Sequence, residues 1–118
     1  MSEKSKLFDL TGKVAVITGG GGLLGAEHAI ALLDQGAKVI LADKNTEACD
    51  RAVKVLNENG YPDVFAATCD VTSKESWEHL LGKTLKELGS VDILINNAGF
   101  TNQSKSKNFD ASFEKFPL

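Results

Sequence analysis

The sequence predicts an α/β fold built on a parallel sheet with helices on both faces. Four short apolar segments alternate with three segments of helical periodicity along the 118 residues. The apolar segments are nearly continuous, as is typical of strands buried on both faces. This alternation indicates βαβ units. Because their crossovers are right-handed, we expect the strand order 3-2-1-4, with a switch point between the first and fourth strands.

The first half of the chain predicts two strands and two helices. A turn at residues 10–13 leads into a first strand over 14–18, and the second strand spans 38–43. Apolar residues recur at helical spacing over 23–35 and again over 46–59. A glycine follows each of these two segments, as is common just beyond a helix C-terminus.

The second half predicts a third strand over 63–69, a helix, and a fourth strand over 91–95. Residues 72–75 (Thr-Ser-Lys-Glu) form a capping box, in which Thr72 would cap the helix and Glu75 would reach back to it. The helix is expected to end at Leu88 and to cross the face opposite the first two helices. Its apolar stripe is expected to pack in the core and consists of Trp77, Leu80, Leu81, Leu85 and Leu88.

The composition argues against several classes of protein. Apolar residues make up 42% and charged residues 25%, as in a globular protein, and the net charge of −3 lacks the basic footprint of a nucleic-acid binder. No apolar run suits a membrane span, and the polar N-terminus lacks a signal peptide's apolar core, so we expect a cytoplasmic protein. Cys49 and Cys69 lack metal-ligand or redox spacing and are expected to be buried free thiols, and no metal site is predicted.

Four successive glycines separate the first strand from the first helix. Helix N-termini leave N–H groups unpaired and hold about half a positive charge, so they attract anions. Glycines let a pyrophosphate approach the backbone and permit a tight turn. Alone, the run would also suit a flexible surface turn. However, Gly20, Gly22 and Gly25 match the G-x-G-x-x-G dinucleotide fingerprint, and Asp43 follows about 20 residues later, as the fingerprint requires.

Four features fall at the carboxyl ends of the predicted strands. They are the turn over 19–25, Asp43, Asp70 and residues 96–99 (Asn-Asn-Ala-Gly). In open α/β sheets, ligands bind at this edge, beside the switch point. The sequence therefore predicts one dinucleotide site there.

Three motifs resemble those of the short-chain dehydrogenase/reductase family. Residues 10–19 (LTGKVAVITG) look like its opening strand and residues 69–72 (CDVT) like the end of its third strand. Residues 91–99 (VDILINNAG) look like its fourth strand and NNAG motif. The resemblance covers nearly the whole chain, and the combination of motifs is highly specific.

The resemblance implies a partial, truncated Rossmann fold with a doubly wound parallel sheet. Residues 1–118 would form the N-terminal part of one NAD(P)-binding domain. Residues 13–99 would be its cofactor-binding core, and residues 100–118 a loop or tail.

The resemblance also implies roles for the matched residues. The backbone of the glycine turn would cradle the pyrophosphate, with Leu24 near the nicotinamide, and Asp43 would accept hydrogen bonds from the adenosine ribose. Asp70 and Val71 would contact the adenine, while Asn96 would tie adjacent strands together. The expected cofactor-binding residues are Gly19, Gly20, Gly21, Gly22, Leu23, Leu24, Gly25, Asp43, Asp70, Val71, Asn97, Ala98 and Gly99.

NAD(H) is the expected cofactor, and NADP(H) is less favoured. The carboxylate of Asp43 would repel the 2′-phosphate of NADP(H). Lys44 beside it would either pair with that phosphate or be a solvated turn residue.

The glycine spacing departs from the pattern of the NNAG-bearing branch. That branch has T-G-x-x-x-G-x-G, with glycine where this chain has Leu23. Residues 18–25 instead fit T-G-x-x-G-x-x-G, which resembles the extended branch that includes nucleotide-sugar epimerases. The later motifs are more numerous and favour the NNAG-bearing branch.

No catalytic residue is expected within these 118 residues. The family's hydride transfer uses a Tyr as general acid/base, a Lys four residues later and a Ser that orients the carbonyl. The only tyrosine here is Tyr61, which is followed four residues later by Phe65 and lies in a predicted turn. A full family member has about 250 residues, consistent with a large α/β domain.

We therefore expect the dinucleotide-binding part of an oxidoreductase that interconverts secondary alcohols and ketones, without its catalytic half. The full-length protein would take a small alcohol or ketone and form a homo-oligomer, with no nucleic-acid or membrane partner. Two alternatives stay open, a non-catalytic dinucleotide-binding module and a fragment of an extended-branch epimerase or dehydratase. The fourth strand would keep an open edge and partly exposed apolar residues, so the isolated chain is expected to associate.

Overall fold

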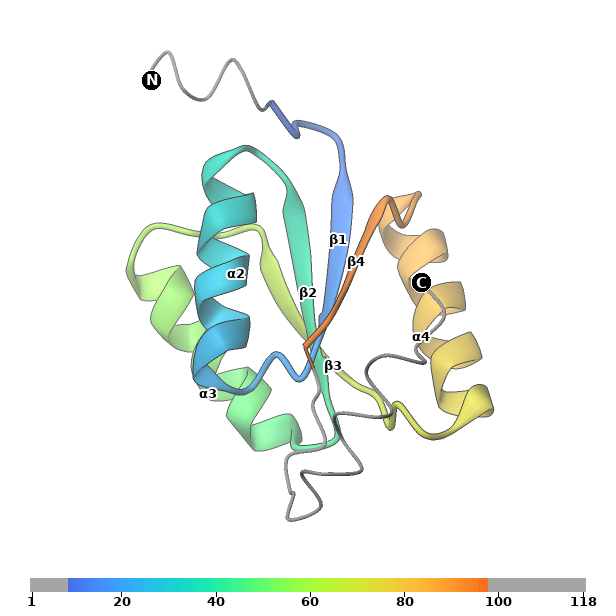
Figure 1. Ribbon diagram of the computed structural model, residues 1–118. Coiled ribbons are helices and arrows are strands. Elements are labelled where there is room, and N and C mark those ends of the chain that lie inside the picture. The colour runs from blue at the N-terminus through green and yellow to red at the C-terminus, as the bar shows by residue number, and fades with distance from the viewer. Residues whose placement is uncertain (1–8, 98–118) are drawn as a thin grey trace, which may run out of the picture.

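The computed structural model describes residues 9–97 and forms a parallel sheet between two layers of helix (Figure 1). Its strands are hydrogen-bonded in the order β3-β2-β1-β4, which confirms the predicted fold class and strand order. Predictions for residues 98–118 lie outside the described residues. The elements are β1 (Val14–Thr18), α2 (Leu23–Asp34), β2 (Lys38–Asp43), α3 (Thr46–Glu58), β3 (Val64–Thr68), α4 (Lys74–Leu88) and β4 (Ile93–Asn96).

Helices α2 and α3 cover one face of the sheet, and α4 covers the other (Figure 1). This placement confirms that the third predicted helix crosses the face opposite the first two. Side chains alternate between the two faces along each strand. Ile17 and Leu41 belong to the core beneath α2 and α3, whereas Val16 and Ile40 pack with Leu80 of α4.

Strand β1 is the most protected part of the sheet. All five of its residues are buried, because β2 and β4 pair with its two edges and helices cover both of its faces. Within residues 9–97, β3 and β4 each pair on one side only. The carboxyl end of β1 is therefore fixed at the middle of the sheet's edge.

Most element boundaries agree with the predictions to within one residue, but β4 spans Ile93–Asn96 rather than residues 91–95. Asp92 lies just before this strand. Its carboxylate accepts hydrogen bonds from the backbone N–H of Val14 (2.9 Å) and the hydroxyl of Ser90 (2.7 Å). The N–H of Asp92 in turn donates to the carbonyl of Val14 (2.8 Å). These reciprocal bonds align the start of β4 with the start of β1.

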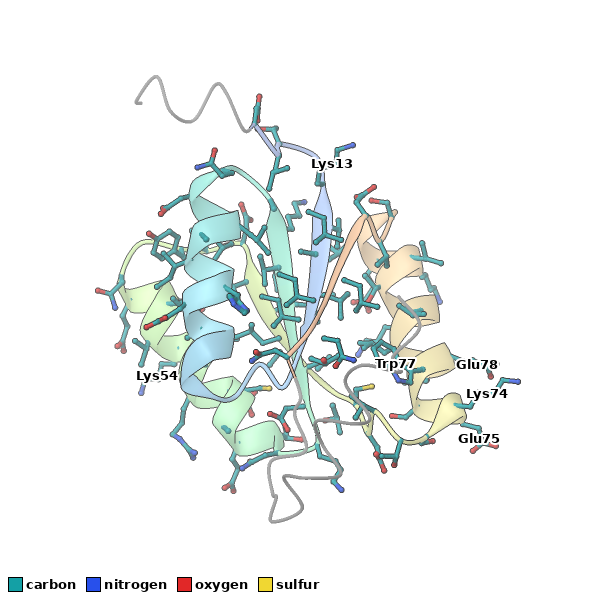
Figure 2. All side chains as sticks on the ribbon, in the orientation of Figure 1. Lys13, Lys54, Lys74, Glu75, Trp77 and Glu78 are labelled. Atoms are coloured by element: carbon teal, nitrogen blue, oxygen red, sulfur yellow. The ribbon has the colours of Figure 1, made fainter. Side chains whose placement is uncertain are left out.

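The predicted capping box of α4 is wrong by one residue. Ser73 caps the helix, because its hydroxyl oxygen accepts the N–H of Ser76 (3.1 Å). Thr72 instead donates its N–H (2.9 Å) and its hydroxyl (2.6 Å) to the carboxylate of Asp70. In the described part of the chain, Glu75 makes no hydrogen bond back to the cap, and its side chain points outward (Figure 2). Either hydroxyl residue suits a cap, and the preceding carboxylate decides between them.

The predicted core stripe of α4 is wrong at Leu85, which is 51% exposed. Leu80 is buried against the sheet, and Leu85 lies about 140° around the helix axis from it, so it points to the side of the helix. Leu94 of β4 is also 53% exposed. It pairs with Val16 and therefore faces the α4 side of the sheet. The expectation that apolar residues of the fourth strand stay partly exposed is confirmed.

We predict that the chain loses stability below about pH 4, partly through Asp92. The hydroxyl of Ser90, then the N–H of Val14, and then nearby Lys13 hold the pKa of Asp92 below its ordinary value of 3.8. A carboxylate with a lowered folded-state pKa stabilises the fold fully above its unfolded pKa. That stabilisation is lost as the pH falls through the folded pKa. The urea midpoint should therefore fall as the pH is lowered from 5 to 3. This window includes the pKa of an aspartate in the unfolded chain, about 3.9.

The variant Asp92→Asn isolates the contribution of this carboxylate to the pH dependence of stability. It should unfold at lower urea than the wild type at pH 7, and the difference should shrink as the pH falls through the lowered folded-state pKa, because Asp92 then becomes neutral like the asparagine. A difference that stays the same size as the pH falls would contradict the assignment.

We also predict that the isolated chain associates through the open edge of β4, where Leu94 is exposed. Sedimentation should show a mean mass that rises at tens of micromolar, roughly the range in which exposed apolar surface drives association. Leu94→Lys should raise the monomer fraction, because a charge on an edge strand opposes pairing. Val55→Lys is the matched control, since Val55 is 54% exposed on α3 and should have no such effect. A monodisperse wild-type monomer that unfolds cooperatively would contradict the prediction.

Candidate functional site

The turn between β1 and α2 lies directly against the end of β2. Gly19 adopts a φ of +67°, a conformation that favours glycine. The N–H of Gly20 donates to the carbonyl of Ala42 (3.1 Å). A Cβ atom at Gly20 would lie only 2.6 Å from the Cβ of Leu41, so any side chain here would displace the turn from β2.

Gly25 lets the first turn of α2 pack closely on the same turn. A Cβ at this position would lie 2.8 Å from the Cα of Gly20 and 3.0 Å from the carbonyl oxygen of Gly19. The third glycine of the fingerprint therefore sets the distance between helix and turn, as expected for close helix–strand packing.

The N-terminus of α2 has backbone donors without a side-chain cap. Gly22 is the N-cap residue and makes no side-chain cap, no side chain among residues 9–97 is seen to accept from the first turn, and no acidic residue lies in that turn. Such an end presents unpaired N–H groups and a positive helix dipole to an anion. Leu23 and Leu24 form the first helical positions. The prediction that Leu24 packs near a nicotinamide concerns a side chain outside the described residues.

The carboxylate of Asp43 contacts this turn from the end of β2. Its Oδ2 accepts the N–H of Gly21 (3.2 Å), and its Oδ1 accepts the N–H of Asn45 (3.1 Å). A Cβ at Gly21 would lie 2.6 Å from the Cβ of Ala48 and 3.2 Å from this Oδ2. The fold thus brings together two features that are 22 residues apart in the chain and holds the carboxylate between the turn and α3.

Asp70 and Val71 follow β3 at the same edge of the sheet. The hydroxyl of Thr72, then its N–H, and also nearby Lys44 lower the pKa of Asp70, so this carboxylate is ionised at neutral pH. Its Oδ1 accepts both bonds from Thr72. Within residues 9–97, neither its Oδ2 nor the N–H of Val71 forms a hydrogen bond.

The ends of β1 and β4 are joined through the hydroxyl of Thr18. It donates to the Oδ1 of Asn96 (2.9 Å) and accepts the N–H of Asn97 (3.1 Å). The side-chain amide of Asn97 also approaches the carbonyl of Gly19 (3.5 Å). The expectation that Asn96 ties adjacent strands together is confirmed. The central role of Thr18 was missed, although a threonine that ends a buried strand beside a glycine turn was a visible clue.

The sequence-predicted residues therefore gather at the lower edge of the sheet in Figure 1, where the strands end. Ala98 and Gly99 lie outside the described residues. A separate cavity of about 280 Å³ lies between α4 and the middle of β2 and β3. Its walls include Ile40, Phe65 and Leu80 but none of the predicted cofactor residues. The cavity and the predicted site are thus distinct.

The two cysteines are buried free thiols, as predicted. Burial first, and then the charges of Asp43 and Asp50, raise the pKa of Cys49 to about 11. Burial also raises the pKa of Cys69. Both thiols are protonated at neutral pH, the form that is a poor nucleophile. Residues 9–97 include no cluster of three His, Cys, Asp or Glu placed to hold a metal ion. In that range, no helix has the length and apolarity needed to cross a bilayer.

A family model for short chain dehydrogenases matches residues 13–115. The chain belongs to this family. The 7alpha-hydroxysteroid dehydrogenase of Escherichia coli (strain K12) is 41% identical to it over 90 residues. The crystal structure of an NAD+-bound xylitol dehydrogenase matches with a TM-score of 0.70 and 36% identity, over 76% of this chain and 34% of that one. An actinorhodin polyketide ketoreductase with NADPH matches with a TM-score of 0.69 and 34% identity, over 74% and 33%.

The chain spans about a third of the length of these relatives. The segment aligned with the Escherichia coli enzyme is 76% of this chain but 35% of that protein. The matched residues 13–115 include the glycine turn and every strand end described above.

We predict that Gly25→Ala displaces the glycine turn. The added methyl group meets backbone rather than a flexible side chain, so the variant should lose roughly 1–3 kcal/mol of stability, the usual range for overpacking. Urea unfolding measures the loss. Gly82→Ala is the matched control, because nothing lies within 4 Å of a Cβ there. In the exposed interior of α4 it should stabilise by up to about 1 kcal/mol. Equal effects of the two substitutions would show that Gly25 makes no special contact.

Proposed function

We propose that this chain is the dinucleotide-binding part of a short-chain oxidoreductase that uses NAD(H) to interconvert secondary alcohols and ketones. The observation that supports this most directly is the uncapped N-terminus of α2 beside the Asp43 carboxylate. Residues 13–99 would be the cofactor-binding core of one domain, to which all 118 residues belong. Bound NAD(H) would supply the hydride donor or acceptor.

The pyrophosphate would bind at the start of α2. The glycine turn is packed closely against β2 and α2, which would hold its backbone in place beside the helix end. Several of its N–H groups already bond within the protein: that of Gly20 with Ala42, that of Gly21 with Asp43 and that of Gly22 with Gly19. The donors for the pyrophosphate are therefore expected in the first turn of the helix, at the backbone of Leu23 and Leu24.

The ribose of the adenosine half would bind to Asp43. Two backbone N–H groups orient this carboxylate, and it is only partly buried, so it can accept bonds from the 2′- and 3′-hydroxyls. A 2′-phosphate would meet like charge at the same place, which favours NAD(H). One similar structure contains NAD+ and another contains NADPH, so the relatives favour neither cofactor. The proposed preference for NAD(H) therefore rests on Asp43. Lys44 is exposed beside it and is the residue that would weaken the preference.

The adenine would bind beside Asp70 and Val71. The free Oδ2 of Asp70 is a charged acceptor for the amino group of adenine. The unbonded N–H of Val71 is a donor for the neighbouring ring nitrogen. Asn97, with Ala98 and Gly99, would line the ribose from the β4 side. The described residues thus offer a complementary group to each part of the adenosine half.

The family and the relatives support the alcohol–ketone reaction. The full-length protein would take a small alcohol or ketone as its substrate. The full-length protein would be a homo-oligomer. The spacing of Gly19, Gly22 and Gly25 favours a second candidate, a fragment of a nucleotide-sugar epimerase. Binding of a UDP-sugar distinguishes the two, because it should be absent under the first proposal.

We predict that calorimetric titration detects NAD binding to the 118-residue chain, with weaker binding of NADP. Asp43→Ala should weaken NAD by about ten- to a hundredfold, the range for hydrogen bonds to a charged group, and should reduce the discrimination between the cofactors. Asp50→Ala is the control, since it removes the same charge from an exposed position of α3 and should leave both affinities unchanged. If the wild type binds neither cofactor, the proposal fails.

A further inference from the structure

Trp77 has a polar contact that its place in an apolar stripe does not require. Its ring is partly buried and packs against the core on the α4 side of the sheet. Figure 2 shows it in the lower half of α4, on the sheet side, with Lys74, Glu75 and Glu78 pointing away. Its indole N–H donates to the backbone carbonyl of Val71 at 3.0 Å. The ring therefore connects the core to the loop that follows β3.

Two further bonds attach the same loop to the first turn of α4. The N–H of Asp70 donates to the hydroxyl oxygen of Ser76 (2.9 Å). The carbonyl of Asp70 accepts the N–H of Ser73 (3.0 Å). Neighbouring side chains of the helix, Ser76 and Trp77, thus hold the loop on both sides of the peptide between Asp70 and Val71.

These contacts determine where the N–H of Val71 points. Its peptide plane is fixed at the carbonyl end by Ser73, and a trans peptide directs its N–H to the opposite side. The preceding peptide is fixed by Ser76, and the following one by Trp77. Without the indole N–H, the Val71 carbonyl would lose its described partner, and only the bond from the Thr72 N–H to the Asp70 carboxylate would hold the following peptide. The direction of the Val71 donor would then be less well defined.

We propose that Trp77 is a positioning residue for the adenine end of the cofactor, acting through the Val71 carbonyl. The inference rests on the proposed function, because it assumes that Val71 donates to adenine. Trp77 itself does not touch the ligand. It holds the loop in its binding geometry before the ligand arrives, which lowers the ordering cost of binding.

The first test uses the wild-type chain and nuclear magnetic resonance. Trp77 is the only tryptophan, so its indole N–H gives a single assignable resonance. AMP should shift this resonance and slow its exchange with solvent, because ligand and indole stabilise the same loop geometry. Inorganic pyrophosphate, which would contact only the start of α2, should leave it unchanged. An indole resonance that ignores AMP while AMP binds would overturn the inference.

The second test uses the variant Trp77→Phe, which removes the donor and keeps an aromatic ring. It should weaken AMP and NAD by the same factor, about five- to tenfold for one hydrogen bond, and leave pyrophosphate binding unchanged. Leu88→Ala is the matched control, because Leu88 packs against the same core cluster. It should lower the thermal midpoint without changing the affinity of the folded protein for AMP.

The outcomes distinguish the inference from the function on which it rests. If the wild type binds NAD and Trp77→Phe binds it equally well, Trp77 is a core residue only. If Leu88→Ala weakens AMP as much as Trp77→Phe does, general loosening explains the loss and the inference fails. If the wild type binds neither NAD nor AMP, the proposed function itself is wrong.

Discussion

The close approach of the glycine turn to β2 is the constraint on which the rest of this edge depends. The turn contacts Leu41 at a distance that admits no side chain at Gly20, and Gly25 lets α2 pack on the same backbone. This approach places Gly21 within a hydrogen bond of Asp43. It also directs the uncapped end of α2 toward the carboxyl edge of the sheet. A larger residue at these contacts would separate the helix end from the carboxylate.

The groups at this edge are mostly backbone atoms that side chains of neighbouring elements hold in place. Thr18 joins the ends of β1 and β4, and Asp43 joins β2 to the glycine turn. Ser76 and Trp77 hold the loop after β3. At the opposite end of the sheet, the bonds between Asp92 and Val14 align the amino ends of β1 and β4. Strand ends held in this way can present donors and acceptors at fixed positions, which limits the ordering cost of binding.

Much of the fold could be predicted because buried parallel strands leave continuous apolar runs, while helices repeat with a different period. The predictions failed where a neighbouring side chain or element determines the local structure. Thr72 and Ser73 are both suitable caps, and only the position of the Asp70 carboxylate selects Ser73. Leu85 has the spacing of a core residue, but periodicity does not reveal that α4 has no neighbouring helix on that side within residues 9–97. The hydrogen bond that Trp77 donates was not predicted, because its apolar ring fits the core stripe without it.

The sequence by itself determined the order of elements, the strand order and the identity of the residues at the carboxyl edge. It could do so because glycine spacing, apolar runs and handed crossovers are local or nearly local properties. The tertiary structure decided which of these residues meet: Gly21 with Asp43, Thr18 with Asn96, and Trp77 with Val71. Those pairings depend on strand register and on where each helix lies across the sheet. A linear pattern does not specify these distances, because they arise only when separate elements pack together.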